Sequence, residues 1–154
     1  MKKISFLSIL FLTVLIACNQ TVDNKKGNQD TASPLINAEK ALEDSANYTT
    51  IEWLDSTFRD LGKVTEGQIV EISWRFKNTG NKPLIIVNTS ASCGCTIAEK
   101  PEQPIAPGEE SVIKAKFDSN GRPEGEQRKE VYVTANTKES PGHNLSFRLE
   151  LVKK

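Results

Sequence analysis

The sequence has few of the residues that enzymes use for nucleophilic and acid–base chemistry. Among its 154 residues are one histidine, one methionine and three cysteines. It has no Gly-x-Ser-x-Gly elbow, no His-Glu-x-x-His helix and no phosphate-binding loop. Its carboxylates are scattered over turn-like segments and outward strand positions, where a solvated surface is their usual setting. We therefore predict a protein that is not an enzyme and that has no catalytic residue and no cofactor.

An excess of charge of one sign is also missing. The chain has 20 basic and 20 acidic side chains, and no long basic run stands anywhere in it. Proteins that bind nucleic acid neutralise phosphates with clustered lysines and arginines, which gives them a basic patch or stripe. The composition excludes such a patch, so we expect no nucleic-acid partner.

Long hydrophobic runs are absent except at the N-terminus. The uncharged run 4–16 follows the basic residues Lys2 and Lys3. It is shorter than the roughly 20 residues that a membrane-spanning helix needs. A short apolar run behind a basic start is typical of a secretory signal peptide, so the pattern predicts export.

The end of this run carries a lipidation signal. Leu15-Ile16-Ala17-Cys18 resembles the bacterial lipobox, in which the cysteine thiol is alkylated with diacylglycerol and the chain is cut before it. We predict a lipoprotein signal peptide over residues 1–17 and a lipid anchor on Cys18. Two or three acyl chains hold a protein firmly, because each buried methylene contributes about 0.8 kcal/mol. The expected partner is the membrane, and the expected location faces the periplasm, the outer membrane or the cell surface.

Residues 18–48 are predicted to form a tether behind the lipidated cysteine. The first dozen residues are polar and cannot bury enough apolar surface to offset their ordering entropy, so we expect them to be flexible. A short helix is predicted later in this segment, with Ser33 as its N-cap and Pro34 at its first position. Leu35, Ala38 and Leu42 would share one face of that helix.

From residue 49 to residue 154 the hydrophobic period changes to two, which indicates half-buried strands. In 69–77 the apolar side chains Val70, Ile72, Trp74 and Phe76 alternate with polar ones. Further strands are predicted at 84–87, 113–117, 131–135 and 145–151, with Gly, Pro and Asn turns between them. This pattern predicts an all-β fold, an immunoglobulin-like antiparallel β-sandwich with one core. Trp53 and Trp74 are expected to be core aromatics.

Several short motifs of this domain stand in a characteristic order. They are Phe76, Asn78, Thr79 and Gly80, then Ser92-Cys93-Gly94-Cys95-Thr96, then Pro107-Gly108-Glu109, and finally the strand 131–136. In this combination the segment from Phe58 to about Leu151 resembles the bacterial family catalogued as domain of unknown function 1573. The resemblance implies an exported, often lipid-anchored protein with an Ig-like fold, related in shape to Hydin and major-sperm-protein domains. It implies little about function.

Cys93 and Cys95 are the cysteines that remain once Cys18 carries the lipid. In a regular strand their Cα atoms would lie about 6.6 Å apart, near the upper limit for a disulfide. Gly94 between them permits a sharper bend, so we expect that a bridge can form, although a strained one. An exported chain is exposed to oxidising conditions, which favour such a bridge.

Four roles for this pair stay open at the level of sequence. The cysteines could shape a loop, exchange with other thiols, bind a soft metal such as copper(I) or zinc, or join two molecules. His143 is the one imidazole available as a further metal ligand. Our leading hypothesis is a lipid-anchored envelope module with a non-catalytic binding or structural role, and an envelope protein or a glycan as partner. The predicted contact surface is the segment 90–96, with the loop 138–144 as a second candidate.

Overall fold

The computed structural model describes residues 34–154. The predicted signal peptide, Cys18 and the first part of the predicted tether, including Ser33, lie outside the described residues. Helix α1 (Pro34–Glu43) and the 3-10 turn η1 (Ser45–Asn47) precede eight strands, so the helix predicted to start at Pro34 is present. None of the described helices has the length and apolar composition needed to cross a membrane.

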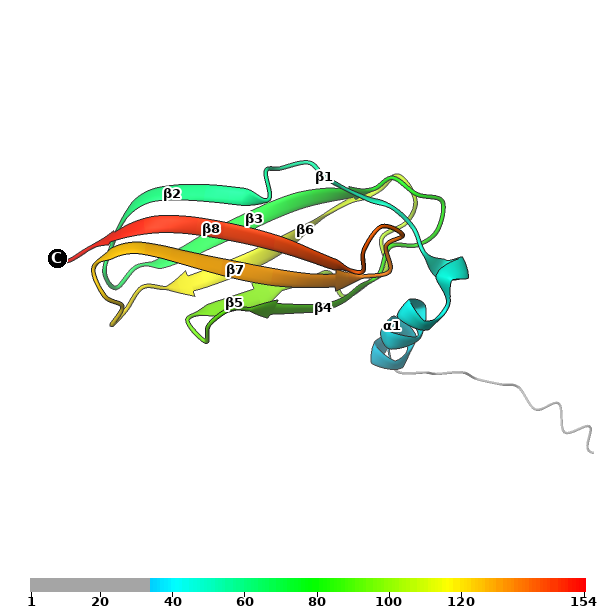
Figure 1. Cartoon of the computed structure of the whole chain (residues 1–154), viewed down its shortest axis with the longest axis horizontal. Helices are drawn as coiled ribbons and strands as arrows, with labels where there is room; N and C mark the ends of the chain where they lie inside the picture. The colour runs from blue at the N-terminus through cyan, green and yellow to red at the C-terminus, as the bar shows by residue number, and fades with distance from the viewer. Residues whose placement is uncertain (1–33) are drawn as a thin grey trace, which may run out of the picture. The chain divides into compact units, whose positions relative to one another are not determined.

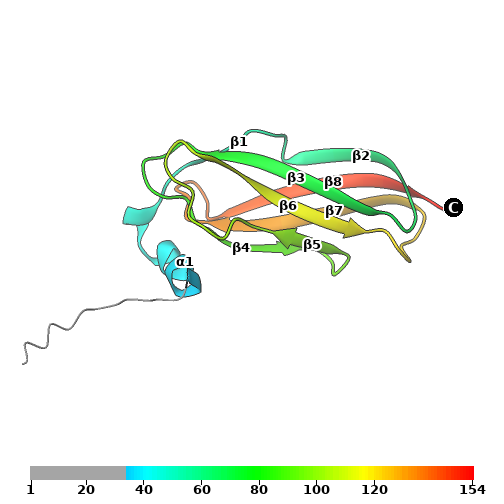
Figure 2. The ribbon, with the colours of Figure 1, turned by 180° about the vertical axis from the view of Figure 1, so that it is seen from behind.

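The eight strands form two four-stranded sheets packed face to face (Figures 1 and 2). One sheet has the order β1-β3-β6-β5, and the other has the order β2-β8-β7-β4. Their bounds are β1 Ile51–Trp53, β2 Phe58–Thr65, β3 Ile69–Asn78, β4 Ile86–Ala91, β5 Thr96–Glu99, β6 Glu110–Asp118, β7 Gly125–Ala135 and β8 Gly142–Val152. The predicted all-β sandwich is confirmed. One pair, β2 with β8, is parallel, and the other pairs are antiparallel.

The core lies between the two sheets and is built by side chains at alternate strand positions. In β3 the alternation places Ile72, Trp74 and Phe76 inside, as their spacing predicts. Trp53 is half-buried and packs edge-on against Phe76. The largest fully buried side chains include Trp74, Phe76, Phe117, Phe147, Ile113, Leu145, Leu149 and Leu151. Burial of such side chains contributes about 1.5–3 kcal/mol each and is the main stabilising term of the fold.

Two of the predicted strands have different bounds in the structure. The strand expected at 84–87 begins at Ile86 and continues to Ala91. Leu84 instead forms an isolated bridge with Ile105, and the amide of Ile85 donates to the Asn136 side chain. β7 starts at Gly125, earlier than its apolar positions indicated. Its charged first half pairs with β8 like the rest of the strand but places no side chain in the core.

The helix packs on the end of the sandwich where the chain enters the first strand. Ala38 and Ala41 are its buried residues, and the Tyr48 hydroxyl donates to the carbonyl of Leu42. Ala38 therefore lies on the buried face as predicted, together with Ala41, and Leu42 is half-buried. At this end Thr49 pairs with Thr137 in an isolated parallel bridge.

Candidate functional site

The Cys93–Cys95 pair lies in the connection between β4 and β5. This connection carries the chain from one sheet to the other, because β4 belongs to the β7 sheet and β5 belongs to the β6 sheet. A disulfide joins the two cysteines, and their Cα atoms are 5.2 Å apart. The amide of Thr96 donates to the carbonyl of Cys93 at 3.2 Å, so residues 93–96 form a tight hydrogen-bonded turn. We refer to residues 92–96 as the disulfide turn.

The turn itself, not a special glycine conformation, brings the cysteines together. Gly94 is not among the glycines with a positive φ, and a Cβ placed on it would meet no atom within 4 Å. The sharp bend that Gly94 was expected to permit is present and the bridge forms, but Gly94 does not use a left-handed backbone conformation. The Cα separation is shorter than a regular strand gives because the chain reverses here between the two sheets.

The two sulfur atoms have different surroundings. Cys95 is 5 % exposed and belongs to the hydrophobic core, whereas Cys93 is partly exposed and packs against the core from outside. The Thr96 Oγ1 lies 3.7 Å from the Cys93 Sγ and 3.9 Å from the Cys95 Sγ. Disulfide sulfurs carry no hydrogen, so in both contacts the threonine hydroxyl is the donor.

Backbone hydrogen bonds hold the turn from both sheets. The amide of Ser92 donates to the carbonyl of Glu130 at 2.9 Å, and the amide of Glu130 donates to the Ser92 hydroxyl at 3.1 Å. On the other side, the amide of Asp118 donates to the carbonyl of Cys95 at 2.9 Å. The disulfide turn is therefore fixed in place by the folded domain as well as by its own covalent bond.

Two exposed isoleucines lie on the outer face of the β3-β6-β5 sheet, near this turn. Ile97 is 64 % exposed and Ile69 is 68 % exposed. Between them, Glu71 of β3 lies opposite Lys116 of β6, which in turn lies opposite Ile97 of β5. Lys116 forms ion pairs with Glu71 and Glu99 and separates the two isoleucines, so they are two apolar positions on a charged face and not one continuous apolar patch. No local sequence pattern indicates this pair, because only the register across β6 brings the two residues to one face.

His143 does not join the cysteines. It lies on β8 opposite Val133, and its ring packs edge-on against Trp53. Its Nε2 is 2.9 Å from the Thr137 Oγ1, whose hydroxyl donates to the carbonyl of Ser140. Burial lowers the pKa of His143, and Glu139 opposes that shift.

These positions bear on the metal hypothesis. Because the Thr137 hydroxyl donates its hydrogen bond to the carbonyl of Ser140, it accepts one from the His143 Nε2. That nitrogen is therefore a hydrogen-bond donor and is not free to bind a metal. Both cysteine sulfurs are used in the disulfide. Within residues 34–154, no group of three or more His, Cys, Asp or Glu side chains is placed to hold a metal ion.

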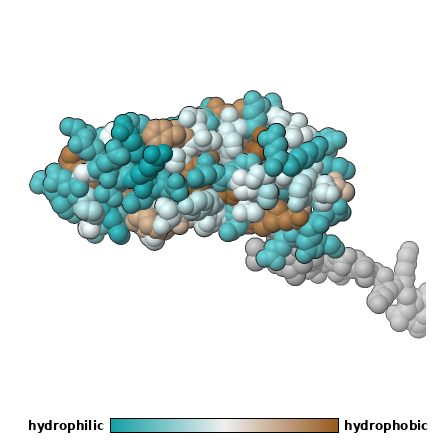
Figure 3. All heavy atoms as spheres, viewed as in Figure 1, coloured by the Kyte–Doolittle hydropathy of each residue, from teal (hydrophilic) through white to brown (hydrophobic). Residues whose placement is uncertain are grey.

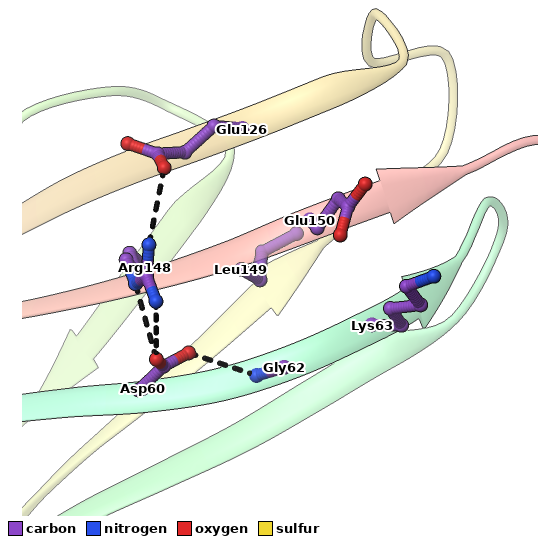
Figure 4. A pocket seen from close by; sticks show the side chains of 7 residues that line it. All are labelled: Asp60, Gly62, Lys63, Glu126, Arg148, Leu149 and Glu150. Carbon is purple, nitrogen blue, oxygen red and sulfur yellow. Dashed lines mark hydrogen bonds and ion pairs between the residues drawn. The ribbon is translucent and has the colours of Figure 1, made fainter.

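A second polar feature covers the outer face of the β2-β8-β7 sheet. Figure 4 shows Arg148 between Asp60 and Glu126, with ion-pair distances of 2.6 Å and 3.2 Å. These side chains line an open pocket of about 460 Å³. The pocket lies over a bulge of β2, where Gly62 has φ +65° and its amide donates to the Asp60 carboxylate.

The ion pairs occupy the charged groups of this pocket. Hydrogen bonds from Arg148 and then from the Gly62 amide lower the pKa of Asp60, so this carboxylate stays charged. A carboxylate held in this way is a poor general base. Figure 3, viewed as Figure 1, shows mostly hydrophilic or neutral side chains over β2, β8 and β7. The pocket is therefore lined by a solvated ion-pair cluster that spans three strands.

Other residues that carry the family resemblance have a structural role. The Asn78 side chain is fully buried: its Oδ1 accepts from the Thr49 hydroxyl and the Gly80 amide, and its Nδ2 donates to the carbonyls of Lys82 and Ile105. A Cβ on Gly80 would clash with the Thr49 hydroxyl and come within 2.7 Å of the Thr50 amide. These residues lock loops at the end of the sandwich where the chain enters.

Residues 51–150 match the family described as protein of unknown function, DUF1573. The chain belongs to the DUF1573 family. The disulfide turn, Asn78 and Gly80 fall inside the matched range. No curated protein matches the sequence.

Solved structures share the fold of this DUF1573 protein. A protein of unknown function from Porphyromonas gingivalis W83 is 18% identical with a TM-score of 0.60, and the match covers 70% of this chain. The chain spans only about half of that protein, 49% of its length. The ASH/PapD-like domain 7 of human CEP192 is 9% identical with a TM-score of 0.51, and the match covers 70% of this chain and 89% of that domain. At these identities the likeness shows the fold alone.

Proposed function

We propose that this DUF1573 protein is an exported, lipid-anchored module of the bacterial cell envelope that acts by non-catalytic binding. The observation that carries the proposal is the disulfide between Cys93 and Cys95. Disulfides persist in exported proteins and are rare in the cytosol. The predicted signal peptide over residues 1–17 and the predicted lipidation at Cys18 support the same location.

The proposed contact surface consists of the disulfide turn together with Ile69 and Ile97. The chain enters the sandwich at Thr49, and β4 runs from that end of the sandwich toward the disulfide turn (Figure 1). This surface therefore lies away from the point where the chain enters the sandwich. Exposed aliphatic side chains pack well on apolar protein surfaces, whereas protein sites for sugars rely on stacking aromatic rings. We therefore favour an envelope protein over a glycan as the partner.

Metabolic labelling tests the anchor. Cells that express the full chain are grown with a labelled fatty acid and fractionated, beside cells that express a Cys18→Ser variant. We expect label and membrane association for the parent protein and neither for the variant. An unlabelled parent protein in the soluble cytoplasmic fraction would overturn the proposal.

Site-specific photo-crosslinking in living cells tests the contact surface. A photoreactive amino acid replaces Ile97 in one variant and Tyr132 in the matched control. Tyr132 is also exposed but lies on β7, in the other sheet. We expect a discrete adduct with an envelope protein from position 97 and none from position 132. Equal patterns from both positions would remove this surface from the proposal.

A further inference from the structure

We propose that the Cys93–Cys95 disulfide exchanges with thiols while the domain stays folded, with Cys93 as the attacked sulfur and Cys95 as the leaving sulfur. The inference goes beyond binding, although it uses the same exposed turn as the proposed function. It requires neither the lipid anchor nor the envelope partner.

Unequal access selects the sulfur that is attacked. A thiolate must reach a disulfide sulfur in line with the bond that breaks. Cys95 is 5 % exposed and enclosed by the core, whereas Cys93 is partly exposed at the edge of the sandwich. An incoming thiolate therefore meets Cys93 first and forms a mixed disulfide there.

The Thr96 hydroxyl assists the departure of Cys95. A negative charge on a buried sulfur is costly unless a donor faces it. Thr96 is itself buried, and its Oγ1 is 3.9 Å from the Cys95 Sγ and 3.7 Å from the Cys93 Sγ. This single donor stands close to both sulfurs, so it is placed to move toward the one that becomes a thiolate.

The fold does not depend on the bond that is exchanged. The cysteines are two residues apart in the sequence, so the bridge closes a very small loop and constrains the unfolded chain little. The turn is also held by the Ser92–Glu130 pair and by the hydrogen bond from Asp118 to the Cys95 carbonyl. The site can open and close without loss of the surrounding strands.

The exchange balances without a further reagent. A thiolate attacks the Cys93 Sγ, the Sγ–Sγ bond breaks, and its electron pair leaves on the Cys95 Sγ, which then takes a proton from water. A second external thiolate can attack the outer sulfur of the mixed disulfide and release Cys93 as a thiolate. The two external thiols are then oxidised to a disulfide, and the two cysteines of the protein are reduced.

The test uses the purified full chain in its native buffer with reduced glutathione as the probe. Samples are acid-quenched at intervals, and fragment ions of the peptide that contains both cysteines locate the adduct. We expect glutathione on Cys93, a free thiol on Cys95, and circular dichroism unchanged during the reaction.

Four variants make the test specific. Thr96→Val keeps the size of the side chain and removes the hydroxyl, so we expect about tenfold slower adduct formation, equivalent to one hydrogen bond of about 1.4 kcal/mol to a charged group. Thr96→Ser should restore the rate. In Cys95→Ser, the remaining Cys93 should be alkylated rapidly by iodoacetamide. In Cys93→Ser, the remaining Cys95 should be protected.

Each contrary result overturns the inference. Glutathione on Cys95, or equal alkylation of the two single variants, would refute the asymmetry. Exchange only after denaturation would refute reactivity in the folded state, and an unchanged rate in Thr96→Val would refute the role of the hydroxyl. None of these outcomes affects the anchor or crosslinking results, so the inference and the proposed function fail separately.

Discussion

Reduction of the Cys93–Cys95 disulfide is expected to lower the stability of the domain only modestly. In the chain-entropy description, a bridge that closes a loop of about three residues contributes about 1.6 kcal/mol, against about 3 kcal/mol for a 15-residue loop. The sequence separation of 2 puts this bridge at the small end of that scale. For a domain of about 105 residues the unfolding entropy is about 0.22 kcal/mol per degree, so the expected fall in Tm is about 7 °C.

Thermal unfolding followed by circular dichroism measures this shift. The full chain with Cys18→Ser is heated with and without a phosphine reductant, which breaks the disulfide without adding a thiol. A double Cys93→Ala and Cys95→Ala variant should lose more than the reduced protein, because Cys95 is buried and its truncation leaves a cavity. Unfolding on reduction at room temperature would show that the bridge holds the fold together, and our account of an exchangeable bond would then be wrong.

Three further perturbations test the structural reading. Asn78→Ala should lower the free energy of unfolding by about 3–5 kcal/mol in urea denaturation, because it leaves several buried hydrogen-bonding groups unpaired. The control Asn88→Ala, at an exposed position, should change the free energy of unfolding by less than about 0.5 kcal/mol. Equal losses in the two variants would refute the role of the Asn78 network. Gly80→Ala should strongly destabilise the protein, whereas Gly94→Ala should be tolerated, since only the first Cβ meets other atoms; a lower Tm for the second variant would contradict the turn geometry. Burial lowers the pKa of His143 in the folded state, so the contribution of the neutral imidazole to stability should be full above about pH 6.5 and be lost as the pH falls through the lowered pKa. A His143→Gln variant should lack this loss of stability at low pH. Identical pH profiles for the parent protein and the variant would refute the role of His143.

The alternating strands could be predicted from the sequence because one face of each is buried. In β3, the spacing of Ile72, Trp74 and Phe76 leaves one way to bury all three side chains. β2 gives no such signal, because its ladder is interrupted by a bulge between Asp60 and Lys63 and most of its side chains are not buried. The edge strands β1 and β5 are too short for any period to be recognised.

The candidate site was only partly predictable for a similar reason. The spacing of Cys93 and Cys95 drew attention to the pair from the sequence alone. The hydroxyl of Thr96 beside both sulfurs depends on the turn between the sheets. The exposed pair Ile69 and Ile97 depends on register across β6, which no local pattern encodes.

The buried asparagines were misleading in sequence. Asn78 precedes Thr79 and Gly80 and was interpreted as part of a turn, and Asn136 was placed at the end of the predicted strand 131–136. In the fold, Asn136 is fully buried, accepts from the amide of Ile85, and donates to the carbonyls of Asn47 and Pro83. Both side chains act as internal ties between loops that are distant in the sequence, which a local pattern cannot indicate.

Trapping the thiols in intact cells tests the central claim, that this domain carries an accessible disulfide in an oxidising compartment. Cells that express the full chain are quenched with acid, treated with one alkylating label, reduced, and treated with a second label of different mass. We predict that Cys93 and Cys95 take only the second label. If both residues take the first label, the pair is reduced in the cell, and the argument for export to an oxidising compartment is contradicted.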